Sequence, residues 1–376
     1  MVKKENYIYL DNAASYRTDP EIAEAFRSYA VECFANPEGW NSLSYETSER
    51  IKNASLEISE ILTGVDMLKT FWTDSATTGI NVVSEYLRKK KKRILIAGNE
   101  HPAIRSAFSE CAETVKVTDK GCMNLNHLRS LISEDVCAVV VHHVQNETGI
   151  IENLSGVREV INEVSSDILL MADTVQSLGK IDIPWDKAVV NIAFGAGHKI
   201  GAPSGGAVFY RMNDSELRKF ELYLKELREK YYKVSRPDPA VVFAFTDAVV
   251  KMCENQKRNY DKVRELNCYA REKLLSEIKG IRFLGDTSIC SPYILTFLIR
   301  GIQAEVLVRI LSSYGIMISA GSACSASSNK PSPAVTAMGI SGEDARSVFR
   351  VSFSTFSEIR EVDTLVSGLK KALKEY

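Results

Sequence analysis

Short apolar runs alternate with amphipathic stretches from about residue 55 to residue 210. This alternation is typical of strands and helices that follow one another in α/β proteins. The expected strands are apolar on both faces and lie at 93–97, 115–118, 136–142, 168–172, 189–193 and 206–210. Strands of this kind are buried between two helix layers, as in a mostly parallel sheet. Ligands bind such sheets at the carboxyl ends of the strands, so the following loops are the first places to search for chemistry.

The second half of the chain predicts longer helices and fewer strands. Helices are expected at 214–233, 240–253, 254–278, 305–313 and 358–375, and strands at 293–299 and 348–353. A proline-containing stretch at 235–239 separates the first two helices. We place a domain boundary near 245–255, which predicts a large domain at 15–250. A small α+β domain then consists of 1–14 and 251–376.

Length and charge narrow the function classes. The 376 residues suit two packed domains or one large domain with a lobe, and 45% hydrophobic with 25% charged residues is ordinary for a globular protein. The formal net charge of −1 provides no attraction to nucleic acid or to an anionic membrane. No run reaches the roughly 18 apolar residues of a membrane helix, and residues 1–10 lack the apolar core of a signal peptide. We therefore expect a cytoplasmic protein without direct nucleic-acid or membrane partners.

Eight cysteines are scattered through the chain without a Cys-x-x-Cys pair. Most stand among apolar residues, and a free cysteine packs as a small hydrophobic side chain, so we expect most to be buried. Cys324 differs because it lies in a long loop of small residues, 319–328. Reactive thiols occupy exposed loops of this kind, whereas a structural thiol has little to pack against there. Cys324 is therefore a candidate nucleophile.

Two expected strand ends carry an acid and a lysine. Asp173 ends one apolar run and is followed by Gln176, and a second run leads into His198 and Lys199 among small residues. Pyridoxal phosphate needs a lysine for a Schiff base and an acid opposite its pyridinium nitrogen. Small neighbours let the backbone approach a planar ring. Each motif alone also fits a strand-capping aspartate or a solvated lysine, but the two together suggest this cofactor.

Three further loops at expected strand ends carry polar side chains. Residues 72–79 are rich in hydroxyl groups and precede a helix, which suits a phosphate site or a simple helix cap. His101 suits ring stacking or proton transfer, with a structural histidine as the alternative. Residues 144–149 offer the amide of Asn146 or form a plain turn. All these loops are expected at one edge of the sheet.

The expected strand at 348–353 directs Arg350 and Ser352 to the same face. A bidentate arginine is the usual clamp for an amino-acid carboxylate. A salt bridge on an edge strand is the alternative interpretation.

Many of these motifs occur together, and in this order, in one family. The chain resembles the cysteine desulfurases of the class V aminotransferase family from about residue 9 to about residue 363. The matching motifs lie at 9–14, 36–37, 75–77, 100–101, 146–149, 173–177, 197–199, 321–324 and 350–352. The resemblance implies the α/β architecture of pyridoxal-phosphate fold type I. In that fold a mostly parallel central sheet forms the large domain, beside a smaller α+β domain.

The resemblance also implies a role for individual residues. Lys199 would hold the cofactor, Asp173 would pair with the pyridine nitrogen, and His101 would stack on the ring. Implied cofactor contacts come from Ser75, Ala76, Thr77, His101, Asn146, Asp173, Gln176, His198 and Lys199. Implied substrate contacts come from Asn12, Ala13, Asn146 and Arg350. The implied catalytic residues are Lys199, Cys324 and His101, and no metal is expected.

The reaction implied by the resemblance converts L-cysteine to L-alanine and leaves a persulfide on Cys324. The sulfur would then pass to an acceptor protein. The long loop around Cys324 resembles that of relatives that serve iron–sulfur scaffold proteins and tRNA-thiolating enzymes. A homodimer is also implied.

Three departures from the family pattern keep other functions open. Ala196 stands where the family usually has a phosphate-binding serine, and Ser75 and Thr78 replace a glycine and a glutamate. The Arg-Ser-Gly-Thr stretch of the family is absent from 225–240, where Arg236 is followed by no threonine. One alternative is a pyridoxal-phosphate lyase or aminotransferase that acts on another amino acid. The other is a weakly catalytic partner in a sulfur-transfer complex.

Overall fold

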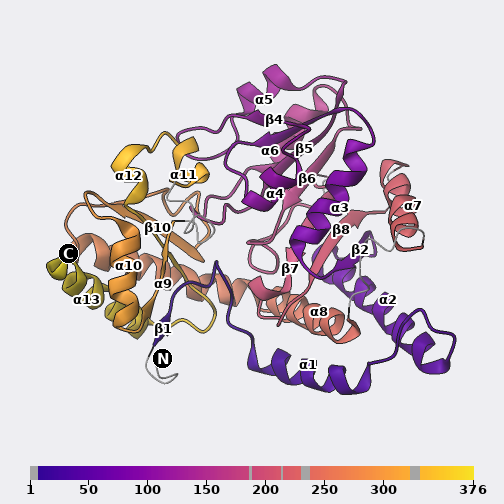
Figure 1. The fold of residues 1–376 in the computed structure, drawn as a ribbon, viewed down its shortest axis with the longest axis horizontal. Helices are drawn as coiled ribbons and strands as arrows, with labels where there is room; N and C mark the ends of the chain where they lie inside the picture. Colours follow the sequence, from indigo (N-terminus) through magenta and orange to yellow (C-terminus); the bar gives the residue numbers. More distant parts are fainter. Residues whose placement is uncertain (1–6, 186–188, 213–214, 230–237, 322–330) are drawn as a thin grey trace.

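The larger of the two main sheets is mostly parallel. The structure is a computed structural model that describes residues 7–185, 189–212, 215–229, 238–321 and 331–376. The sheet contains, in spatial order, β2 (Leu68–Thr73), β8 (Gly206–Arg211), β7 (Ile192–Ala196), β6 (Leu169–Asp173), β5 (Val136–His142), β3 (Arg93–Ala97) and β4 (Ala112–Val115). β8 is antiparallel to β2 and β7, and every other neighbouring pair is parallel. The predicted α/β class is confirmed (Figure 1).

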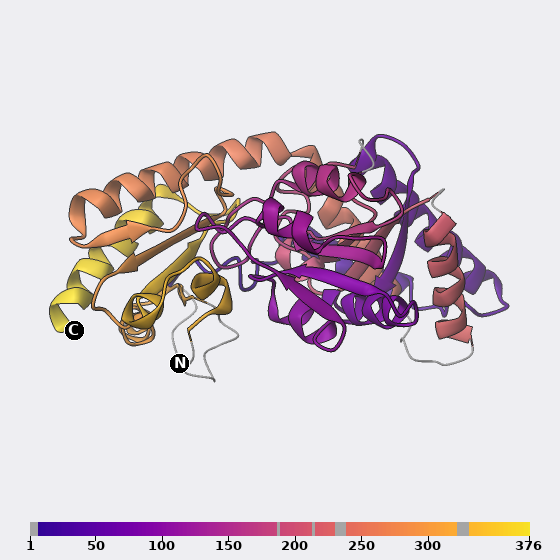
Figure 2. The ribbon, with the colours of Figure 1, turned by 90° about the horizontal axis from the view of Figure 1, so that it is seen from above.

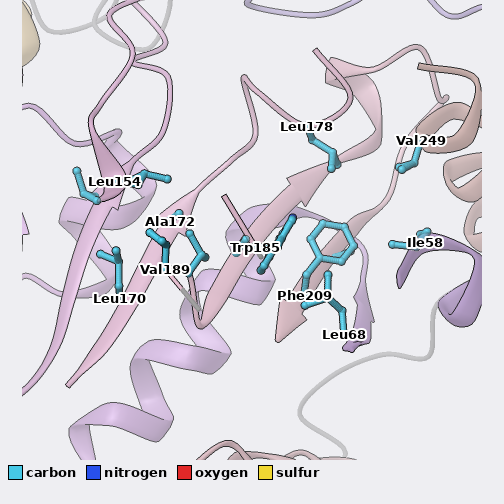
Figure 3. Packing of buried hydrophobic residues seen from close by; sticks show 14 of the residues in the cluster. Ile58, Leu68, Leu154, Leu170, Ala172, Leu178, Trp185, Val189, Phe209 and Val249 are labelled. Carbon is cyan, nitrogen blue, oxygen red and sulfur yellow. The ribbon is translucent and has the colours of Figure 1, made fainter. Parts of the chain in front are cut away.

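Helices cover both faces of this sheet. They are α1 (Pro20–Glu32), α2 (Ser42–Thr63), α3 (Ala76–Arg88), α4 (Pro102–Ala107), α5 (Leu125–Leu131), α6 (Leu154–Asn162), α7 (Ser215–Glu229) and α8 (Pro239–Glu254). Successive strand residues point to opposite faces, so Leu95 packs with α2 and α8 in one core whereas Ile94 packs with α3 and α7 in the other. Figure 3 shows the first core, with Phe209 of β8 together with Ile58 of α2 and Val249 of α8.

A second, smaller sheet lies to one side of the first (Figures 1 and 2). Its antiparallel strands are, in order, β12 (Ser319–Ala320), β13 (Val348–Ser352), β10 (Ile294–Ile299) and β9 (Ile281–Phe283). The helices here are α9 (Gln256–Glu277), α10 (Ala304–Ser313), α11 (Pro333–Ala337), α12 (Gly342–Arg346) and α13 (Ile359–Glu375). The faces of α9, α10 and α13 that contact this sheet form a core of their own.

The amino-terminal segment joins the two sheets. β1 (Ile8–Tyr9) pairs in parallel with β11 (Ile316–Met317), and Asp11 bridges to Ser352 of β13. The chain then continues past the larger sheet, where Tyr16 N–H donates to the carbonyl of His198 at 2.8 Å. The division into domains at 15–250 and 1–14 plus 251–376 stays a prediction. Among the described residues, no helix is long and apolar enough to cross a membrane.

Several element boundaries differ from those expected. The strands expected at 115–118 and 189–193 lie at Ala112–Val115 and Ile192–Ala196. The second shift arises because strand pairing continues into the small residues Gly195 and Ala196, which pack against β8. β2, α1 and α2 have no counterpart among the expected elements, and β2 interrupts its apolar positions with Lys69 and Thr70.

Candidate active site

The polar loops singled out in the sequence lie at one edge of the larger sheet. His142 at the end of β5 pairs with Asp173 at the end of β6. Ala196 at the end of β7 pairs with Gly206 of β8, which in turn pairs with Thr73 at the end of β2. The carboxyl ends of these four strands therefore lie along one edge of the sheet, and the loop that starts α3 follows one of them, β2. This confirms the expectation that the loops share one edge.

Lys199 lies in the 3₁₀ turn η1 (Gly197–Lys199) that follows β7. Its side chain is half-buried, and Nζ donates to the carbonyls of Ala13 at 2.7 Å and Ala14 at 2.5 Å. A Cβ on Gly197 would lie 2.1 Å from the carbonyl oxygen of Ser204. Only glycine fits this close approach, which fixes the turn that presents Lys199 to the sheet edge.

A second lysine, Lys180, is buried near Lys199, and no site role was assigned to it from the sequence. Its Nζ lies 5.1 Å from the ring centroid of Tyr16 and 5.5 Å from that of Tyr293. Burial and the positive charge of Lys199 lower the pKa of Lys180 from 10.5 to about 7. Burial, Lys199 and Lys180 also lower the pKa of His198 to about 4. These basic groups therefore form one electrostatic cluster beside the sheet edge.

We expect Lys180→Met to be more stable than the wild type at pH 7, and the difference to shrink towards pH 10. The unfolded chain keeps this proton up to about 10.5, whereas the folded chain releases it above about 7. Between these values the unfolded state binds more protons, so wild-type stability rises with pH, by at most about 1.4 kcal/mol per unit. Methionine has a similar length and no charge. Urea unfolding at pH 7, 8.5 and 10 measures the difference, and a gap that does not change with pH would contradict the assignment.

Asp173 is a buried acid beside two histidines. Its Oδ1 accepts a hydrogen bond from Val175 N–H at 3.0 Å. Burial raises the pKa of Asp173, and the positive potential of His101 and His142 opposes that shift. His101 caps α4, where its Nδ1 accepts from Ala103 N–H at 3.1 Å, so in the neutral ring the proton is on Nε2. A buried carboxylate in this position is stabilised by a neighbouring cation.

Gln176 and the amino-terminal segment contact each other at the same edge. Gln176 Nε2 donates to the carbonyl of Ala13 at 2.9 Å, so Gln176 and Lys199 share this acceptor. Asn12 is buried, and its Nδ2 donates to the carbonyl of Ser352 at 2.9 Å. Its Oδ1 has no hydrogen-bond partner in the part of the chain that the structure describes. The amide of Asn12 therefore anchors the amino-terminal segment to β13.

The start of α3 forms a polar corner of the site. Ser75 caps the helix and its Oγ accepts from Thr78 N–H at 3.2 Å. The N–H groups of Ala76 and Thr77 have no acceptor within the helix, as at every helix start. A Cβ on Gly206 would lie 2.1 Å from the carbonyl carbon of Ser75, so glycine lets β8 approach this loop. These groups and the Ser75 and Thr77 hydroxyls offer donors for an anion.

Arg350 is 2% exposed and binds three parts of the chain. Its Nη2 donates to Asp11 Oδ1 at 2.8 Å and to Ser319 Oγ at 3.2 Å, and its Nη1 donates to the carbonyl of Asn146 at 2.9 Å. The alternative interpretation as an edge-strand salt bridge is wrong in one respect, because β13 lies between β12 and β10. Asn146 is half-buried beside this guanidinium, and its Oδ1 accepts from Gln145 Nε2 at 3.3 Å.

We expect Arg350→Lys to lower the free energy of unfolding by about 2–3 kcal/mol. A lysine ammonium keeps the charge but cannot reach Asp11, Ser319 and Asn146 from one position, because it lacks the planar fork. Ser319→Ala is the matched control, since it removes only the 3.2 Å contact and should lower the free energy of unfolding by about 1 kcal/mol. Urea unfolding of both variants measures the effect. Equal midpoints for Arg350→Lys and wild type would contradict the bridging role.

Two sequence predictions fall outside the described residues: Cys324 and Arg236. Three of the seven described cysteines are buried and four are half-buried, so the expectation that most are buried is too strong. Burial raises the pKa of six of these seven thiols, to about 12 for Cys253 and Cys290. These six are poor nucleophiles, because the thiolate is the reactive form.

Known proteins that resemble this chain over nearly its whole length belong to one family. A family model described as aminotransferase class-V matches residues 8–365. The cysteine desulfurase NifS of Azotobacter vinelandii is 25% identical and aligns with 96% of this chain and 90% of its own length. The cysteine desulfurase IscS of Buchnera aphidicola is 28% identical, with 98% and 93% aligned.

Solved structures share the fold. A NifS-like protein from Rickettsia africae superposes with a TM-score of 0.84 at 20% identity, over 98% of this chain and 100% of its own. The family model spans nearly the whole sequence. The chain therefore belongs to the aminotransferase class-V family.

Proposed function

We propose that this protein is a pyridoxal-phosphate-dependent cysteine desulfurase that converts L-cysteine to L-alanine and carries the released sulfur on Cys324. The observation that supports it most is the meeting of a lysine, a buried acid and an amide at one sheet edge. Lys199 and Gln176 share the carbonyl of Ala13, and Asp173 lies buried at the neighbouring strand end. The names of the relatives supply the substrate class.

The residues present fit pyridoxal phosphate. Asp173 is a buried carboxyl group at a strand end, and a protonated pyridine nitrogen is a cation that would stabilise its charged form. The start of α3 offers N–H and hydroxyl donors for a phosphate group. Ala196 supplies no hydroxyl there, so one donor of the family pattern is missing. The bound cofactor supplies an electron sink that stabilises negative charge at the substrate Cα.

The protein's own groups would then act as follows. The Lys199 amine holds the cofactor covalently and, once released, moves the proton at the substrate Cα. The Asp173 carboxylate would keep the pyridine nitrogen protonated, and His101 would stack on the ring. Arg350 and Asn146 position the substrate carboxylate, which would compete with Asp11 for the guanidinium.

Sulfur transfer falls to Cys324. Its thiolate attacks the sulfur of L-cysteine, a sulfur–sulfur bond forms and the carbon–sulfur bond of the substrate breaks. The electron pair of that bond stays on the substrate carbon, which gains a proton and leaves as alanine. We further propose that the protein forms a homodimer and that an acceptor protein takes the sulfur of the persulfide. A cytoplasmic location stays a prediction from the sequence.

Steady-state turnover tests this function. The protein loaded with pyridoxal phosphate is given L-cysteine and a thiol reductant, and alanine and sulfide are measured. Equal amounts of both support the proposal. Turnover of another amino acid but not of L-cysteine would favour a lyase or aminotransferase. This alternative is motivated by Ala196 and by the altered sequence of residues 225–240. Cofactor binding without turnover of any amino acid would favour the weakly catalytic partner.

A further inference from the structure

Glu100 and His142 form a buried pair behind the sheet edge. Glu100 Oε1 lies 2.8 Å from His142 Nδ1 and also accepts from the backbone N–H of His142 at 2.8 Å. Glu100 is 2% exposed and His142 is 3% exposed. Glu100 Oε2 and His142 Nε2 have no hydrogen-bond partner among the described residues. A carboxylate buried this deeply requires a cation, and His142 is the group in contact with it.

The pair lies beside Asp173. His142 and Asp173 are paired residues on neighbouring parallel strands, so their side chains leave the sheet on the same face. The groups that act electrostatically on His142 are Glu100, Glu152 and Asp173. Both carboxylate oxygens of Glu152 accept backbone N–H groups, from Met123 at 2.6 Å and Asn153 at 3.0 Å, so Glu152 needs no proton from His142.

The pKa values of the adjacent residues His142 and His143 shift in opposite directions. Burial lowers the pKa of His142, but the charge and hydrogen bond of Glu100 raise it by a larger amount, so the pKa lies above its ordinary value. His143 is equally buried, and its Nδ1 has no partner among the described residues. Burial and the charge of His142 lower the pKa of His143 to about 4. The contact with Glu100 is the difference between them.

We propose that Glu100 and His142 are positioning residues: they form a buried ion pair in which the His142 imidazolium cancels the Glu100 charge at Asp173. This rests on the proposed function, in which Asp173 faces the pyridine nitrogen of the cofactor. Without that cation, Glu100 would place a second negative charge beside Asp173. The pair therefore lets Asp173 alone set the charge that the cofactor ring meets.

Histidine NMR on the full chain tests the ion pair without any cofactor. The sequence holds five histidines, and His142→Gln assigns the relevant signal. We expect His142 to stay protonated above the ordinary histidine pKa of 6.5, while His143 and His198 stay neutral down to about pH 4. A His142 that loses its proton at or below 6.5 would overturn the proposal.

Absorbance titration of the cofactor-loaded protein tests the coupling to Asp173. Glutamine at 142 keeps a donor for Glu100 but removes the charge, so His142→Gln should raise the pH midpoint of the visible band by about one unit. The double variant His142→Gln, Glu100→Gln restores neutrality and should return the midpoint. The matched control His127→Gln alters a histidine on α5 and should shift nothing. An unchanged midpoint in His142→Gln, or a shift that persists in the double variant, refutes the coupling even if the protein desulfurates cysteine.

Discussion

Lys199→Ala should lower the rate of alanine formation from L-cysteine by about 10³-fold or more, because the covalent attachment and the proton transfer at Cα both depend on this amine. The visible band of the bound cofactor should shift to that of the non-covalent form. Lys199 is half-buried and its Nζ contacts two backbone carbonyls, so its loss should leave the fold intact. Absorbance spectra and single-point alanine assays measure both effects.

The matched control for this variant is Lys251→Ala. Lys251 is a half-buried lysine on α8 that pairs with Asp19 at 2.8 Å and Glu21 at 2.7 Å and has no proposed role at the site. Ion pairs that water reaches contribute at most about 1 kcal/mol, so this variant should keep the wild-type spectrum and rate. If Lys199→Ala kept both as well, the covalent lysine would have to be another residue.

Cys324→Ser should lower sulfide release by about 10²-fold or more while the cofactor spectrum stays as in the wild type. A serine hydroxyl is a far weaker nucleophile toward sulfur than a thiolate and forms no persulfide. The spectrum is expected to persist because none of the residues proposed to hold the cofactor is altered. Sulfide assays with a reductant, together with absorbance spectra, measure the two properties.

Cys268→Ser controls for the chemical change itself. Cys268 is a half-buried thiol on α9, in the helix layer of the smaller sheet, and should be replaceable without loss of sulfide release. A Cys324→Ser protein that releases sulfide at the wild-type rate would show that another thiol, or water, receives the sulfur.

Strands that are buried on both faces could be predicted from the sequence, because they are continuous apolar runs. β3 and β5 lie where the pattern placed them. β2 could not be predicted, because its partner strand β8 is distant in sequence and Lys69 interrupts its apolar pattern. Leu68 pairs with Arg211, which follows it by 143 residues (211 − 68). The Lys69 ammonium pairs with Glu221 on α7 at 2.8 Å, a contact that no local pattern reveals.

In the candidate site too, residues at strand ends could be predicted from the local sequence, whereas contacts between residues distant in sequence could not. Asp173 and Lys199 could be found because Asp173 ends an apolar strand and Lys199 follows one, and parallel sheets bind ligands at these strand ends. The ion pair of Arg350 with Asp11 joins residues 339 apart in sequence, and that of His142 with Glu100 joins residues 42 apart. Lys180 follows Gly179, and no local pattern reveals that the fold brings its ammonium to 5.1 Å from the ring centroid of Tyr16, 164 positions earlier in the chain (180 − 16).

A single turnover without reductant tests the central claim most directly. The cofactor-loaded protein is mixed with L-cysteine in less than stoichiometric amount, and the products are alanine in solution and modified peptides in a mass spectrum. We predict one alanine for each sulfur atom gained, with the added sulfur on the peptide that contains Cys324. Alanine without added sulfur on that peptide, or pyruvate and ammonia in place of alanine, would contradict the account.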